Sequence, residues 1–115
     1  MSTRTARAAE LVELLRDAGV NATRDPRDAI GLAPCVLLPP PRLVFDLPGA
    51  ATTTWTLVAL TLGPGGTAAF DALDDLVDAV AGVLPIETGD AVSYTLPGTD
   101  AGAVPAYLLT YTEGL

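Results

Sequence analysis

Apolar residues recur at helical spacing in two separate stretches of the chain. Residues 4–18 carry them three and four positions apart and are followed by Gly19, which predicts an amphipathic helix. Residues 68–83 repeat the pattern, with Thr67 as an N-cap residue and Pro85 beyond the end. The two stripes are Ala8, Leu11, Val12, Leu15 and Ala18, and then Phe70, Leu73, Val77, Val80 and Leu84. Each helix needs an apolar surface on which to bury its stripe.

Elsewhere the pattern changes to short runs that are rich in β-branched residues or that alternate. The expected strands cover residues 34–38, 42–47, 52–62, 90–96 and 104–112, with a short extended segment at 20–23. Both faces of the 52–62 run are fairly apolar, as in a central strand that is covered on one side by helices and on the other by a neighbouring subunit. The prolines at 39–41 predict a rigid connector, because proline cannot donate to a sheet ladder. Turns or loops are expected at 24–28, 48–49, 63–67 and 97–102.

This order of elements predicts one α+β domain over residues 1–115. We expect one mostly antiparallel sheet with two helices packed on one face, which is a two-layer α/β sandwich. The second face of this sheet would stay half-apolar. A neighbouring subunit is the expected cover for it.

The composition is compatible with a sheet face that a partner covers, but it does not require one. Half of the residues are hydrophobic, only 17% are charged, and the mean hydropathy is +0.41. So few charges favour an apolar surface that a partner covers. A core rich in Ala and Val would explain the same values equally well.

Charge is divided unevenly along the chain. Residues 1–42 hold all six Arg and five of the acidic residues, whereas residues 43–115 hold nine acidic residues and no basic one. A net charge of −8 repels phosphate, so specific binding of nucleic acid is not expected. Ends of opposite sign would favour head-to-tail packing between copies.

Side chains that commonly carry catalysis are scarce. The chain has no His, no Lys and a single cysteine, Cys35, in an apolar run. We therefore expect no enzyme activity, no catalytic residues, no cofactor and no metal site, with Cys35 as a small buried side chain. The N-terminal residues do not resemble a signal peptide, and no apolar run approaches the roughly 20 residues of a bilayer span.

Two charged groups stand out as candidate surfaces. The first is the turn at 24–28, whose charges either bridge subunits or compensate one another in a solvated loop; its residues are Arg24, Asp25, Arg27 and Asp28. The second is a stripe of four carboxylates at i, i+3, i+4 and i+7 on one helix face, made of Asp71, Asp74, Asp75 and Asp78. Within it, Asp74-Asp75-Leu76-Val77-Asp78 resembles the short aspartate-rich pattern that holds magnesium in isoprenoid-diphosphate enzymes, but no basic residues accompany it. We expect this stripe to face solvent or the lumen of an assembly.

The layout as a whole resembles the tail terminator proteins of long-tailed phages, in the form found among actinobacterial phages. The resemblance is carried by the N-terminal amphipathic helix, the turn Thr23-Arg24-Asp25-Pro26-Arg27, and the run from Pro34 to Pro40. The Trp55 strand, the helix around residues 72–77 and a final Thr-rich strand complete it. It covers nearly the whole chain, and no single motif in it is diagnostic.

This resemblance implies a structural virion protein at the junction of tail and head, made in the host cytoplasm. Copies would form a ring, a homo-hexamer, that caps the tail tube, ends its polymerisation and offers the surface for head–tail joining. Its partners would be itself, the tail tube protein and head-side connector proteins, and DNA would pass without specific contact. Other neck or connector proteins, a tail tube subunit, or a small regulatory binding module remain alternatives.

Overall fold

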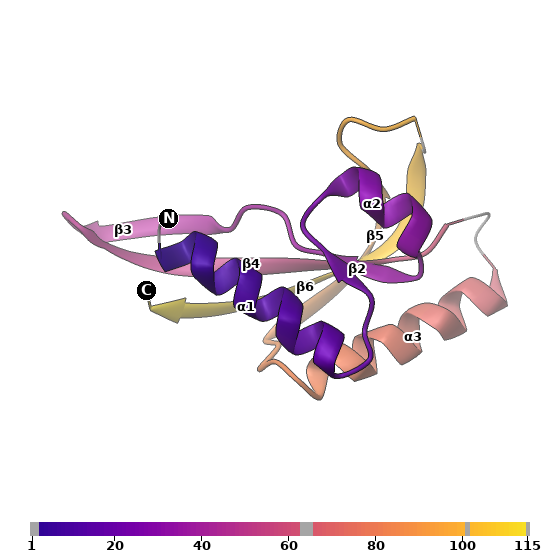
Figure 1. Cartoon of the computed structure of the whole chain (residues 1–115), viewed down its shortest axis with the longest axis horizontal. Helices are drawn as coiled ribbons and strands as arrows, with labels where there is room; N and C mark the ends of the chain where they lie inside the picture. The colour runs from indigo at the N-terminus through magenta and orange to yellow at the C-terminus, as the bar shows by residue number, and fades with distance from the viewer. Residues whose placement is uncertain (1–2, 63–65, 101, 115) are drawn as a thin grey trace.

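The computed structural model describes residues 3–62, 66–100 and 102–114, which form an α+β fold. In chain order the elements are α1 (Thr3–Asp17), β1 (Ala22–Thr23), α2 (Pro26–Leu32), β2 (Cys35–Leu37), β3 (Arg42–Leu47), β4 (Ala50–Leu60), α3 (Thr67–Ala81), β5 (Thr88–Thr95) and β6 (Ala103–Gly114) (Figure 1). The loops expected at 63–67 and 97–102 fall partly outside the described residues. Within these, no helix is long and apolar enough to cross a bilayer.

The sheet is built around β4, which pairs with β2, β3 and β6. β6 pairs with β4 from Thr52–Gly114 to Leu60–Ala106, and β5 adds to the far edge of β6. On the other edge of β4, β2 pairs with the end near Leu60 and β3 pairs with the end near Ala50. These pairs are antiparallel, and β1 alone runs parallel, beside β2, in the described part of the chain. The prediction of a mostly antiparallel sheet is therefore confirmed.

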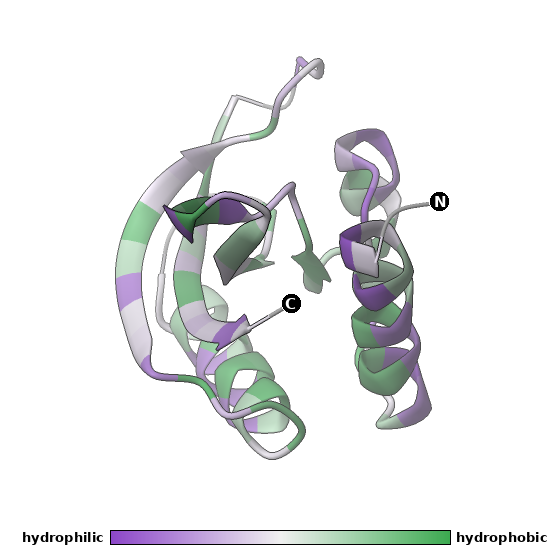
Figure 2. Ribbon diagram, turned by 90° about the vertical axis from the view of Figure 1, so that its left-hand side faces the viewer, coloured by the Kyte–Doolittle hydropathy of each residue, from purple (hydrophilic) through white to green (hydrophobic). Residues whose placement is uncertain are grey.

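Side chains alternate along β4 and separate two apolar clusters. Trp55, Leu57 and Ala59 lie on the face covered by α1 and the end of α3, and this cluster is the main core. Val58 and Leu60 lie on the opposite face, in a smaller cluster with α2. Figure 2, which faces the free end of β3 and β4, shows the sheet as a curved layer with α1 along one side. Both faces of the inner half of β4 are apolar, as expected, but residues of α2 and not of a neighbouring subunit lie against the second face there.

The two predicted helices, α1 and α3, pack on one face as expected, and a third helix, α2, covers part of the second face. Residues 26–32 form the helix α2, although a charged turn was expected at residues 24–28. Asp25 caps it, since its Oδ1 accepts a hydrogen bond of 2.9 Å from the backbone N–H of Arg27, and Pro26 occupies the first turn. Ala29 of α2 is fully buried against the second face, beside Cys35 and Leu37. Part of that face is thus covered by the chain itself and not by a neighbour.

The helical stripes are buried over most but not all of their length. In α1, the buried residues are Ala8, Leu11, Val12 and Leu15, whereas Ala18 lies beyond the helix end and is exposed. In α3, Leu73 and Val80 are buried, but Phe70 is 58% exposed. Phe70 lies beside Ala91 and Ser93 in an open groove over the edge strand β5, where the sheet ends and offers no further cover.

Trp55 is the largest fully buried side chain, and its indole N–H donates a hydrogen bond of 2.7 Å to Glu113. Trp55→Ala should lower the free energy of unfolding by about 3–5 kcal/mol, because a large cavity forms and the carboxylate loses a donor. Urea unfolding followed by circular dichroism measures this change. Phe70→Ala, at an exposed position, should cost less than about 1 kcal/mol. Equal losses in the two variants would contradict the placement of Trp55 in the core.

Candidate assembly surface

The outer ends of β3 and β4, residues 44–51, form a projecting hairpin that we call the arm. It extends past the start of α1 at one end of a molecule that measures 46 × 30 × 23 Å (Figure 1). Phe45 is 61% exposed, Leu47 68% and Val44 40%. The described residues include six exposed large hydrophobics, and half of them lie on this short segment. Such a concentration of apolar surface is typical of a contact with another protein.

Local sequence explains the shape of the arm. Pro48 and Gly49 close the hairpin, and Gly49 has a φ of +79°, which a residue with a side chain rarely adopts. The pairing register shifts between Phe45 and Leu47, as at a β-bulge. Phe45 pairs with Ala51 on the α1 side of the sheet, whereas Val44 pairs with Thr52 on the other side. The arm therefore presents apolar side chains on both faces.

β3 is also an edge strand along the arm. Among the described residues it pairs with β4 alone, so its other edge keeps its backbone N–H and C=O groups available. Proteins usually protect such an edge with charges, prolines or a covering element, because an apolar edge strand pairs readily with other chains. Here the strand reads Arg42-Leu43-Val44-Phe45-Asp46-Leu47, with one acidic residue near its tip. A specific partner would protect this edge.

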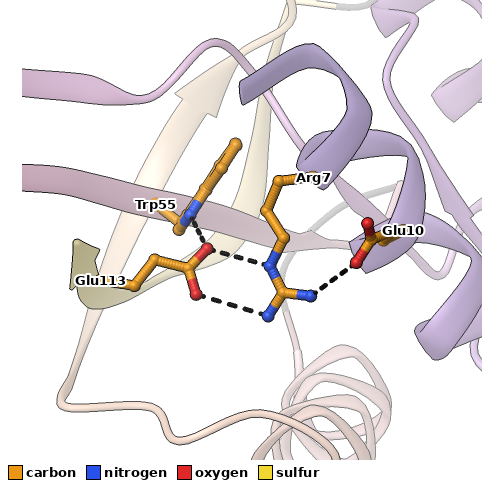
Figure 3. Close-up of polar contacts among 4 residues, drawn as sticks. All are labelled: Arg7, Glu10, Trp55 and Glu113. Atoms are coloured by element: carbon orange, nitrogen blue, oxygen red, sulfur yellow. Dashed lines mark hydrogen bonds and ion pairs between the residues drawn. The ribbon is translucent and has the colours of Figure 1, made fainter. Parts of the chain in front are cut away.

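A network of ion pairs and hydrogen bonds fixes the base of the arm to α1 (Figure 3). Arg7 Nε lies 3.0 Å from Glu113 Oε1, and a second guanidinium nitrogen lies 3.4 Å from Oε2. The same arginine contacts the exposed Glu10 at 3.0 Å. Glu113 also accepts the bond from Trp55, so one carboxylate joins α1, β4 and the end of β6. The pair of Arg7 and Glu113 is only about a quarter exposed, so solvent screens it weakly.

The electrostatics of this network favour its charged form. Glu113 raises the pKa of Arg7 further above its ordinary value, so the guanidinium remains charged. Burial, followed by the nearby Glu113 carboxylate, raises the pKa of Tyr111 to about 12. Tyr111 is thus a neutral phenol at physiological pH. The cluster is a structural clamp in which the partly buried pair of Arg7 and Glu113 lies beside two buried aromatic rings, and the exposed Glu10 adds a second contact to Arg7.

The structure separates the four residues of the predicted interface at 24–28. Asp25 and Arg27 pair with each other at 3.2 Å, and the Arg27 guanidinium and backbone N–H lower the pKa of Asp25. Asp28 is exposed in the first turn of α2. Asp25 and Arg27 thus compensate each other locally, whereas neither Asp28 nor Arg24 forms an ion pair within the described residues.

Arg24 joins Arg4 in the lining of a cavity of about 420 Å³ on the α1 side of the sheet. The cavity lies between the first turns of α1 and the connector Pro39–Pro41, and the Trp55 ring contributes to its wall. Neither arginine forms an ion pair within the described part of the chain, whereas Arg7, Arg16 and Arg27 each do. We call this cavity the arginine pocket. It combines two uncompensated cations with a rigid apolar wall.

The four aspartates of α3 are all exposed: Asp71, Asp74, Asp75 and Asp78. They lie on the helix surface opposite Leu73 and Val80, so no buried carboxylate needs compensation. Within residues 3–62, 66–100 and 102–114, no group of three or more His, Cys, Asp or Glu side chains is placed to hold a metal ion. The stripe is a charged surface, and its carboxylates are spread along the helix axis.

Cys35 is fully buried, as expected, in the smaller cluster beneath α2. Its thiol donates to the carbonyl of Ala29 at 3.6 Å, and burial raises its pKa to about 11. The protonated, inaccessible thiol is a packing group and a poor nucleophile.

Sequence reasoning missed the two features that define this surface. Arg7 lies outside the apolar stripe of its helix, yet it contacts Glu113, 106 residues away. No local pattern can reveal that pair, because the sheet register brings its two members together. The sequence does contain one indication of the arm. Leu43, Val44 and Phe45 are consecutive apolar residues, and they break the alternation that is typical of a half-buried strand.

The sequence was compared with models of protein families and with curated proteins, and no match was found. Any function assigned to the chain must therefore follow from the surfaces described above and from the layout of its sequence.

The clamp around Glu113 should contribute measurably to stability. Glu113→Gln removes the charge that pairs with the partly buried Arg7, and it should lower the free energy of unfolding by about 1–3 kcal/mol. Glu10→Gln is the matched control, because it makes the same chemical change in an exposed partner of the same arginine. It should cost less than about 0.5 kcal/mol. If Glu10→Gln is as costly as Glu113→Gln in urea unfolding, the clamp is not the stabilising contact.

The aspartates of α3 should not hold a metal ion. Titration calorimetry with magnesium, calcium and manganese should show only weak binding without fixed stoichiometry, since the carboxylates do not converge on one point. Asp74→Asn combined with Asp78→Asn should leave the fold unchanged. A tight one-to-one complex that this double change abolishes would instead support a metal-dependent enzyme.

Proposed function

We propose that the chain is a structural subunit that assembles with copies of itself into a ring, as a tail terminator of a long-tailed phage does. The observation that carries this proposal is the arm, with Phe45 and Leu47 exposed at 61% and 68%. An apolar hairpin that projects from a small domain costs solubility unless a partner covers it. Repeated contacts between identical copies provide such cover at every position of a closed ring.

The distribution of charge supports a ring through which DNA passes. The nine acidic residues beyond residue 42 include the four exposed aspartates of α3. A ring built from such subunits has a strongly negative surface, and placing α3 toward the channel would repel the phosphate backbone. DNA would then slide without being held. The same charge is unsuited to a protein that grips nucleic acid.

In this proposal the subunit has a purely structural role. One face of the ring would bind the last ring of the tail tube and stop its growth, and the other would receive the head-side connector proteins. The ring would be a hexamer located at the tail–head junction of the virion. The arm would supply contacts between neighbouring subunits, and the clamp around Glu113 would hold each arm at a fixed angle to its domain.

Assembly can be tested with two matched double variants. Phe45→Ser with Leu47→Ser removes the apolar arm surface, whereas Leu14→Ser with Ile30→Ser removes two residues that are 42% and 39% exposed elsewhere. The arm variant should raise the dissociation constant for self-association at least tenfold, and the control should not. Sedimentation velocity measures association, and negative-stain images show rings or capped tubes. Circular dichroism confirms that both variants fold.

Association can need the tail tube as a template, so the measurement includes tubes polymerised from the tube protein. A wild-type chain that stays monomeric, both alone and beside tubes, would overturn the proposal. A wild-type dimer that ignores tubes would favour a regulatory binding module.

A further inference from the structure

The arginine pocket has the chemistry of a receptor for an acidic and apolar segment. Arg4 and Arg24 line it and have no ion-pair partner within the described residues. The prolines at 39–41 give it a stiff wall, because their φ angles are fixed, and the partly exposed Leu43 adds apolar surface. Two guanidinium groups beside a dry surface select a carboxylate that is flanked by hydrophobic side chains.

The arm of the same chain carries that combination at its tip. Asp46 lies between Phe45 and Leu47, and all three side chains are exposed. Asp46 forms no ion pair within residues 3–62, 66–100 and 102–114. The tip therefore offers one uncompensated carboxylate between two apolar groups, which complements the pocket in charge and in polarity.

The arm cannot fill the pocket of its own copy. Leu43, at the start of β3, already forms part of the pocket lining, and from there the strand runs away from the connector Pro39–Pro41 toward the end of the molecule (Figure 1). Asp46 is three residues further along, about 10 Å at the rise of a β-strand. Pairing of Val44 with Thr52 and of Phe45 with Ala51 keeps the hairpin extended. A second copy is the occupant that the charge and shape of the tip support.

We propose that the arginine pocket of each copy binds the arm tip of the next copy, with Asp46 between Arg4 and Arg24. This inference rests on the self-assembly proposed above and names the contact that would produce it. Donor and acceptor surfaces lie at different places on one chain, so the contact is heterologous. Such contacts propagate from copy to copy and close into a ring when the rotation between copies allows it.

Another part of the chain has a similar pair of residues and serves as the comparison. Phe70 and Asp71 are both exposed on α3. They lie on the broad side of a 15-residue helix, whereas the arm tip is a narrow projecting turn. A concave pocket between a helix and a proline connector accommodates the turn better than the side of a helix.

Charge exchange tests the contact directly. In Asp46→Arg, the arm tip is repelled by the native pocket, and in Arg4→Glu with Arg24→Glu, the pocket repels the native tip. Each variant alone should associate at least tenfold more weakly than the wild type in sedimentation velocity. An equimolar mixture should recover association to within about threefold, because each altered surface then meets its complement. Both variants have a negative net charge, so general attraction cannot produce this recovery.

Asp71→Arg is the control, since it makes the same charge change on α3. It should associate like the wild type, because it keeps the native arm tip and the native pocket. If the wild type assembles but the mixture of the first two variants gains nothing, or if Asp71→Arg weakens association as much as Asp46→Arg does, the arm–pocket contact is wrong and ring assembly must use another surface. A wild-type chain that never associates would overturn both this contact and the proposed function. Circular dichroism and urea midpoints confirm that each variant is folded.

Discussion

The pairing of β4 with three other strands determines where everything else in the molecule lies. One edge of β4 is occupied by β6 over nine successive residue pairs, and the other is shared by β2 and β3. Alternation along the same strand directs Trp55 and Leu57 to the face covered by α1, and Val58 and Leu60 to the face covered by α2. Because β3 takes the outer half of β4, the strand continues past the helices that cover its inner half. The arm is thus a direct result of the register of the sheet.

The sequence predicted most of the elements, since their patterns are local. Two long helices, the five strands near 34–38, 42–47, 52–62, 90–96 and 104–112, and the antiparallel sheet were all predicted from periodicity. The helix α2 was missed, because seven residues containing Gly31 show no stripe and Asp25-Pro26 is equally typical of a turn. The exposure of Phe70 was missed for a different reason. Helical periodicity shows which side of a helix faces a sheet, but not where that sheet ends.

The candidate site was harder to predict than the fold, because its parts are brought together by tertiary structure. The segment at 24–28 was recognised as a charged surface, but three of its four charges are used in and around the cap of α2. Arg24 and Arg4 share a pocket although 20 positions separate them in the sequence, and neither stands in a recognisable motif. The apolar residues of β3 were interpreted as an ordinary strand. Only the register shows that this strand projects beyond the layers that would bury it.

The long-range contact between Arg7 and Glu113 has a consequence for how the protein matures on the ribosome. α1 emerges first, but the carboxylate that clamps it is synthesised more than a hundred residues later. Until β6 has paired with β4, the Trp55 side chain lacks its acceptor and α1 lacks its anchor, so the wall of the arginine pocket is incomplete. A nascent chain therefore exposes its arm before its arginine pocket is fully formed. In the proposed assembly, a chain would bind a neighbouring arm only after β6 has been translated, and a chain interrupted earlier would be left out.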